Sequence, residues 1–292
     1  MKIVFFGTPH FVIPILEVLL KTQQVVGVVT ASDHTGRKGE PIPSPVKKAY
    51  QDHLNEEDFN KPHPPHIFTP DKLTTITHAL VMMQPDLFVT AAYGKILPEE
   101  ILEIPHHGAI NVHPSLLPKY RGPSPITATI LNGDTTTGVS IIQMDTGVDH
   151  GPIIASSSLP VHPTDTHETL ANHLFGKAAE MLPDVIDTIA KRRINYTFQD
   201  HDKATYTHLV KRENGYFDLE NPPGKEKLDR MIRAYYPWPT AWSKVRIKNS
   251  EFRIKFLPGP KVQMEGKNPM TIKEFLNGYP QLRGKIENLF QM

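Results

Sequence analysis

The 292-residue sequence predicts an α/β fold, in which a mostly parallel sheet carries helices on both faces and a small β-rich part follows. The chain opens with a strand, a helix and a second strand, a unit that favours parallel pairing with a right-handed crossover. The most apolar strand, at residues 86–92, suits the centre of such a sheet, where both faces are buried. Near the C-terminal end apolar and polar residues alternate, as they do in half-exposed strands.

The first half of the chain alternates between strands and helices. A buried strand at residues 2–7 is followed by a turn at Thr8-Pro9, and Ser44 can cap a helix that has Pro45 at its first position. Short apolar runs and helical spacing define the other elements. The expected strands are residues 2–7, 25–30, 67–69, 86–92 and 108–112; the expected helices are residues 11–20, 71–83 and 125–131, and one that starts at Pro45.

The second half predicts a long helix and a separate C-terminal domain. Asp149 lies in a tight turn between two strands, and Asp165 or Thr164 can cap the long helix. The elements are strands at residues 138–144, 152–155, 242–247 and 252–256, helices at 166–191 and 224–235, and helix-like segments at 271–276 and 285–290. We therefore expect a domain at residues 1–193, a linker at 194–205 and a second domain at 206–292.

The charge of the chain is unevenly distributed. Residues 206–292 contain 16 Lys and Arg against 9 Asp and Glu, a formal charge of +7, whereas residues 1–205 contain 16 against 22, a charge of −6. A basic terminal domain of this kind favours an anionic partner, and nucleic acid is the usual one. The alternative is a solvated surface with lysine-rich edge strands, and charge alone does not separate the two.

Several classes of protein are excluded. No apolar stretch approaches the roughly 20 residues of a membrane helix, and the first apolar run is too short for a signal peptide, so we expect a cytoplasmic protein without a membrane partner. The absence of cysteine excludes disulfides, thiolate metal sites and cysteine nucleophiles. Gly7-Thr8-Pro9 lacks the later glycines of a dinucleotide fingerprint and no Walker sequence occurs, so NAD and FAD are not expected.

An amide, an imidazole and a carboxylate are expected at strand ends. Asn111 and His113 end one strand, and Asp149 follows Asn111 by 38 residues. Acyl transfer to an amine needs a donor for the oxyanion of the tetrahedral intermediate and a base for the amine, roles that Asn111 and His113 can fill while Asp149 orients the imidazole. The alternative from spacing alone is a strand end with satisfied polar groups. A metal site is a weaker alternative, because asparagine is a poor ligand and the nearby histidines lack helical pairing, so no metal is expected.

The stretch from Asn111-Val-His113 through Ser115, Leu116, Leu117 and Pro118, together with Asp149, resembles the formyltransferase family that uses 10-formyltetrahydrofolate. The resemblance implies a Rossmann-like amino-terminal domain and a small OB-like barrel, incomplete here, at the C-terminal end. It implies that Asn111, His113 and Asp149 are catalytic and that the folate donor is bound by the following residues: Lys95, Ile96 and Leu97, whose backbone would hold the pteridine ring; Ser115, Leu116, Leu117 and Pro118; and Asp145, in the loop that would close over it.

Three features resemble the branch of this family that formylates methionyl-initiator tRNA for translation initiation. Residues 31–47 resemble its inserted basic loop, with Arg37, Lys38 and Lys47 expected to meet the tRNA. Residues 232–242, which include Arg233, resemble the start of its C-terminal domain, and the charge of +7 suits a phosphate backbone. We expect a monomer. A sugar-nucleotide N-formyltransferase with the same folate donor is the nearest alternative, and a folate- or RNA-binding module without turnover is an alternative of another class.

Overall fold

The computed structural model describes residues 1–36, 39–53, 66–247 and 250–290. The chain divides into two compact units whose segments interleave along the sequence. The first unit consists of Met1–Pro123, Thr137–Leu159 and Ala171–Tyr206, and the second of Ser124–Thr136, Pro160–Leu170 and Thr207–Met292. Within the described residues, no helix has both the length and the apolar character to cross a membrane.

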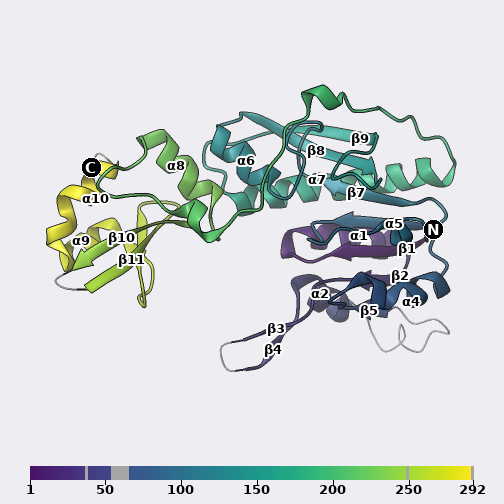
Figure 1. Cartoon of the computed structure of the whole chain (residues 1–292), viewed down its shortest axis with the longest axis horizontal. Coiled ribbons are helices and arrows are strands. Elements are labelled where there is room, and N and C mark those ends of the chain that lie inside the picture. Colours follow the sequence, from purple (N-terminus) through teal and green to yellow (C-terminus); the bar gives the residue numbers. More distant parts are fainter. Residues whose placement is uncertain (37–38, 54–65, 248–249, 291–292) are drawn as a thin grey trace. The chain divides into compact units, whose positions relative to one another are not determined.

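A seven-stranded, mostly parallel sheet forms the larger part of the described fold, in the order β5-β2-β1-β6-β7-β8-β9 (Figure 1). The strands are β1 Lys2–Gly7, β2 Gln24–Val29, β5 His66–Phe68, β6 Leu87–Ala91, β7 Ala109–His113, β8 Thr136–Gln143 and β9 Ile153–Pro160. The pairs from β5 to β7 are parallel, as the sequence predicts, whereas β8 is antiparallel to β7.

Helices cover both faces of this sheet. Successive residues of a strand point to opposite faces, and in β1 both Phe5 and Phe6 are fully buried. Phe6 belongs to a core cluster with side chains from three short helical segments, η2 Leu73–Ile76, α4 Thr77–Met82 and α5 Glu99–Leu102. Side chains of α1 Ile13–Thr22 and α7 His167–Ala190 are also buried, and Phe11, in the short segment η1 just before α1, stacks on Phe175 of α7 at 5.1 Å between ring centroids. The predicted α/β architecture is confirmed.

The helix expected over residues 71–83 is divided into η2 and α4. Two threonines explain the division, because their hydroxyls bond to backbone carbonyls within the segment and so compete with helical hydrogen bonds. Thr75 Oγ1 donates to the Lys72 carbonyl at 2.7 Å, and Thr77 Oγ1 donates to the Thr74 carbonyl at 3.2 Å. The helix expected at Pro45 is present as α2 Pro45–His53, and the Lys47 amide donates to Ser44 Oγ at 3.1 Å, as a capping serine requires.

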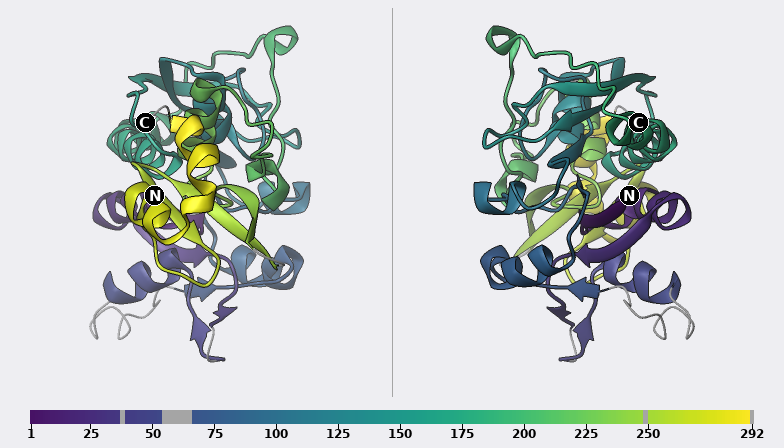
Figure 2. Two further views of the ribbon diagram at one scale, coloured as in Figure 1. Left: turned by 90° about the vertical axis from the view of Figure 1, so that its left-hand side faces the viewer. Right: turned by 90° about the vertical axis from the view of Figure 1, so that its right-hand side faces the viewer.

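A short hairpin of β3 His34–Thr35 and β4 Pro41–Ile42 precedes α2 and projects from the first unit (Figures 1 and 2). Sequence periodicity did not predict it, because each strand is only two residues long. The remaining elements are α6 Pro125–Asn132, η1 His10–Val12, η3 His201–Lys203, η4 Arg212–Gly215 and η5 Pro280–Leu282.

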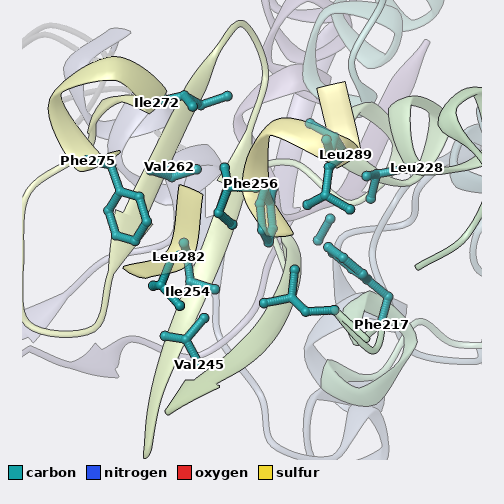
Figure 3. Close-up of a cluster of buried hydrophobic side chains, with 14 of the residues drawn as sticks. Phe217, Leu228, Val245, Ile254, Phe256, Val262, Ile272, Phe275, Leu282 and Leu289 are labelled. Atoms are coloured by element: carbon teal, nitrogen blue, oxygen red, sulfur yellow. The ribbon is translucent and has the colours of Figure 1, made fainter. Parts of the chain in front are cut away.

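The second unit contains an antiparallel sheet of four strands in its described part, in the order β10-β11-β12-β13. The strands are β10 Ala241–Ile247, β11 Ser250–Leu257, β12 Lys261–Met264 and β13 Met270–Thr271, and the helices are α8 Lys225–Ala234, α9 Ile272–Gly278 and α10 Arg283–Phe290. Figure 3 shows Phe256 and Val262 of the sheet packed among helical side chains such as Phe275 and Leu289. The predicted small β-rich part is confirmed, and helices complete its core.

Candidate active site

Strand β7 presents Asn111 and His113 on one face of the sheet, because they are two residues apart. Both side chains meet the carboxylate of Asp149. Asn111 Nδ2 donates to Asp149 Oδ1 at 3.1 Å, and His113 Nδ1 lies 3.4 Å from Asp149 Oδ2. Only about 5% of the His113 side chain and 11% of the Asp149 side chain is exposed, so little solvent screens this contact. The three residues that the sequence singled out are therefore brought together.

The sequence placed Asp149 in the turn between two strands, and it does lie between β8 and β9. Because β8 is antiparallel to β7, this turn starts beside Ile110, at the other end of β7 from His113. Residues 144–152 fold back over β7. Gly151 permits the return, because a Cβ there would lie 1.9 Å from the Gln143 carbonyl oxygen. Asp149 itself has a φ of +48°, a left-handed conformation uncommon for residues with a side chain.

The backbone amide of Gly122 is a further partner of the carboxylate. It donates to Asp149 Oδ2 at 2.8 Å, and Gly122 has a φ of +100°, which glycine adopts without strain. Asp149 therefore accepts a side-chain donor on one oxygen and a backbone donor on the other. Hydrogen bonds to an ionised carboxylate are stronger than those between neutral groups. These two fix the carboxylate against His113.

The ring of His113 is oriented by a backbone carbonyl. His113 Nε2 lies 2.9 Å from the carbonyl oxygen of Tyr120. A carbonyl oxygen only accepts hydrogen bonds, so Nε2 carries a hydrogen and Nδ1 is the nitrogen that faces Asp149 and the site. Nδ1 is therefore the atom that can exchange a proton with a reacting amine. Sequence reasoning did not identify this carbonyl, because any residue provides one.

Thr90 on β6 orients the amide of Asn111. The two residues are register partners, and Thr90 Oγ1 donates to Asn111 Oδ1 at 2.7 Å. Because the amide oxygen faces a hydroxyl donor, the Asn111 NH2 group is directed to Asp149. An NH2 group has two hydrogens, so the bond to Asp149 leaves the second able to donate to an oxyanion. Thr90 was not singled out from sequence, where it reads as one more strand residue.

The residues expected to bind the folate donor lie beside this site or shape its loops. Lys95, Ile96 and Leu97 follow β6, the neighbour of β7. Lys95 Nζ donates to the carbonyls of Pro70 and Asp71 at 2.7 and 2.9 Å, Ile96 is 79% exposed and Leu97 is buried. The lysine thus holds its loop against a neighbouring one, while Ile96 is left facing solvent.

The loop after His113 contains the other predicted folate residues. Ser115 is buried and donates through Oγ to the Lys119 carbonyl at 2.6 Å, and the Leu117 amide donates to Ser140 Oγ at 3.1 Å. Leu116 and Pro118 are partly buried in the same loop. Asp145 lies in the loop that carries Asp149 and pairs with His150 Nδ1 at 2.6 Å. These contacts set the loop conformations, and contact of these residues with a folate stays a prediction.

The predicted tRNA-binding residues are placed less fully. Arg37 and Lys38 lie outside the described residues. Lys47 on α2 pairs with Asp33 at 2.8 Å. Arg233 on α8 pairs with a carboxylate one helical turn away, that of Asp229, at 2.8 Å. It also donates to the Asp165 carbonyl at 2.9 Å. Both described cations already have partners within their own unit.

This fold and site define an enzyme of formyl transfer, and sequence comparison agrees. Residues 1–186 match the family model described as formyl transferase, and the chain belongs to that family. The chain is similar to the methionyl-tRNA formyltransferase of Roseiflexus castenholzii, at 39% identity over 87% of this chain and 80% of that protein. It is similar to the methionyl-tRNA formyltransferase of Nitrosococcus oceani, at 34% identity over 97% of this chain and 95% of that protein. The family membership predicted from the motifs is thereby confirmed.

A solved structure of low sequence identity shares the fold. It is the N-formyltransferase from Helicobacter canadensis in complex with folinic acid and dTDP-3-aminofucose. The superposition has a TM-score of 0.58 at 18% identity and covers 87% of each chain.

Proposed function

We propose that the protein transfers the formyl group of 10-formyltetrahydrofolate to the α-amine of methionine carried by initiator tRNA. The convergence of Asn111, His113 and Asp149 is the observation that carries the proposal, because this trio supplies what acyl transfer to an amine requires. The names of the relatives support methionyl-tRNA as the acceptor. The folinic acid in the Helicobacter canadensis structure supports a folate donor, as does the motif resemblance.

Each residue has a separate task in the proposed reaction. The amine attacks the formyl carbon, and the second hydrogen of the Asn111 NH2 donates to the oxygen that gains negative charge. His113 Nδ1 accepts the proton that the amine loses, and it returns this proton to the leaving nitrogen of the folate. Asp149 holds the Asn111 amide and, once His113 Nδ1 has taken the proton, accepts a hydrogen bond from it and stabilises the imidazolium. The new carbon–nitrogen bond forms as that to the folate breaks.

The acceptor tRNA would be held by basic residues outside the trio. We infer contacts from Arg37, Lys38, Lys47 and Arg233, with the basic C-terminal part of the chain along the phosphate backbone. Lys47 and Arg233 would exchange their present carboxylate partners for phosphate oxygens. An enzyme of translation initiation acts in the cytoplasm, and we infer that it acts as a monomer.

The test is formylation of methionyl-initiator tRNA by the purified full chain with 10-formyltetrahydrofolate. Asn111→Ala and His113→Ala should each lower the rate by about 10²- to 10³-fold, the usual cost of removing one group that stabilises the transition state. His78→Ala, an exposed histidine on α4, is the matched control and should keep the rate. An undiminished rate in the Asn111 and His113 variants would contradict the mechanism.

A second acceptor tests the other half of the proposal. An amino-sugar nucleotide offers only two phosphates, so its KM should depend weakly on salt, whereas tRNA binding should weaken steeply as salt rises. Formylation of the sugar nucleotide in place of tRNA would contradict methionyl-tRNA as the acceptor, while the proposed transfer chemistry would still hold. Folate binding without product from either amine would overturn the assignment as an enzyme.

A further inference from the structure

The segment of residues 197–206, here called the strap, crosses both loops that form the active site. At one end Thr197 and Ile153 exchange two backbone hydrogen bonds of 2.8 and 2.9 Å, close after the loop of Asp149. At the other end the Arg121 amide donates to the Thr205 carbonyl at 2.8 Å, in the loop that follows His113. All of these residues belong to the first unit. Backbone bonds thus tie the strap to the first residue of β9, directly after the Asp149 loop, and to the loop that follows His113.

Gln199 in the strap is bonded through every donor of its amide. Its Nε2 donates to the carbonyls of Asp149 and Gly151 at 2.9 and 2.7 Å, and its Oε1 accepts from Arg121 Nη2 and Nε at 2.7 and 3.1 Å. Because a guanidinium only donates hydrogen bonds, the amide oxygen of Gln199 must face Arg121 and its nitrogen must face the two carbonyls. The side chain is 7% exposed. A buried glutamine with this set of partners has one conformation.

Arg121 continues the connection to the other side of the carboxylate. It is 1% exposed and also donates to His201 Nδ1 at 2.8 Å. The next residue, Gly122, provides the amide that binds Asp149 Oδ2. Gln199 therefore holds the main chain of Asp149 directly. Through Arg121 it also holds the loop whose Gly122 amide binds the Asp149 side chain.

We propose that Gln199 is a positioning residue for formyl transfer, acting with Arg121, and that the strap is part of the active site. Asp149 needs this support because its φ of +48° is unfavourable for a residue with a side chain and persists only where surrounding bonds enforce it. Gln199 touches no reacting atom. It keeps Asp149 within reach of Asn111 and His113, and small displacements of catalytic groups cost large factors in rate. The inference rests on the proposed function for its kinetic readout.

Two substitutions separate the roles of the amide. Gln199→Ala removes all four bonds, whereas Gln199→Glu keeps an acceptor for Arg121 but places a carboxylate where the carbonyls of Asp149 and Gly151 need a donor. Both should lower kcat by about 10- to 100-fold with KM for tRNA unchanged, since a displaced Asp149 impairs the reaction step and not the binding of tRNA.

Gln143→Ala is the matched control. Gln143 Nε2 also donates to two backbone carbonyls, those of His107 and Ala109 at 3.3 and 3.1 Å, toward the amino end of β7 and away from His113. This variant loses the same kind of bond, so it should show a similar fall in Tm with kcat at the value of the unaltered protein. An equal fall of kcat in Gln143→Ala, or an undiminished kcat in both Gln199 variants, would overturn the positioning role.

A readout without turnover keeps this test apart from the proposed function. The ¹⁵N chemical shifts of the His113 ring report its contact with Asp149 and should change in both Gln199 variants but not in Gln143→Ala. If the unaltered protein formylates no methionyl-tRNA, the proposed function fails while these shifts still decide the positioning role. Unchanged His113 shifts in folded Gln199→Ala and Gln199→Glu would overturn it.

Discussion

Replacing Thr90 by valine isolates the contribution of one hydroxyl to catalysis. The Thr90 hydroxyl has a single hydrogen and lies 2.7 Å from Asn111 Oδ1, 3.2 Å from the Ile110 carbonyl and 3.4 Å from Met144 Sδ. The shortest contact is the one to the amide of Asn111, so this is the bond that valine removes. Valine has nearly the same shape, and the buried strand β6 should keep its packing.

The magnitude follows from one buried hydrogen bond between neutral groups. Its net contribution is about 0.5–1.5 kcal/mol. Asn111 remains bonded to Asp149 at 3.1 Å, so the amide is loosened rather than released. If the transition state needs the amide in its present orientation, the same free energy appears in the barrier and kcat should fall about 2- to 10-fold. Stability should fall together with it, with Tm about 2–4 °C lower for each kcal/mol.

The assay is steady-state formylation of methionyl-tRNA, and a second threonine provides the control. Thr30 is also fully buried and makes a 2.7 Å side-chain bond, to Ser44, at the end of β2. Thr30→Val should therefore lower Tm like Thr90→Val but leave kcat unchanged. The decisive comparison adds Thr90→Val to Asn111→Ala, where it should lower kcat no further because the amide through which Thr90 acts is gone. A further fall in that double variant would refute the reasoning.

Three further predictions concern the carboxylate, a helix cap and a buried phenol. Asp149→Asn leaves one acceptor oxygen for two donors, the side chain of Asn111 at 3.1 Å and the Gly122 amide at 2.8 Å. The formylation assay should therefore show kcat lower by at least about 10²-fold. An unreduced kcat in the folded variant would show that the charge and the second bond are dispensable. Thr271 caps α9 by accepting from the Glu274 amide at 3.2 Å, so in urea titrations Thr271→Ala should lower the free energy of unfolding by about 1 kcal/mol and Thr271→Ser should not; equal losses would contradict the cap. Burial raises the pKa of Tyr93 from 10.0 to about 12, so the phenol ionises at lower pH in the unfolded chain than in the folded one. The stabilising contribution of the neutral phenol is therefore complete below pH 10 and should be lost as the pH rises from 10 to 12. Thermal unfolding of Tyr93→Phe should lack this part of the alkaline loss, and an identical pH dependence in both proteins would refute it.

The sequence predicted the elements of the sheet and the pairing of Asn111 with His113 for the same reason, which is that both are local patterns. Asp149 lies 38 positions from Asn111, and the resemblance to the formyltransferase family placed it with them. Buried parallel strands are short apolar runs, and Asn111 and His113 share a face because they are two residues apart on one strand. The direction of β8 was not predictable in this way. Because β8 is buried along almost its whole length, its run of buried residues is the same for either strand direction. Nothing in the local sequence therefore distinguished an antiparallel strand from a parallel one.

The supports of the trio were missed because their partners are distant in the chain. Gln199 bonds to residues 50 and 78 positions away, and Thr90 bonds to an amide 21 positions away. A buried glutamine in a segment without regular structure cannot satisfy its amide from neighbouring backbone, so its partners must come from other loops. In the sequence, Gln199 is only a polar residue in the expected linker at residues 194–205, where an exposed side chain is the ordinary expectation. What separates Gln199 from such residues is its burial, and burial at that position exists only once the loops of Asp149 and Arg121 have been brought against the strap.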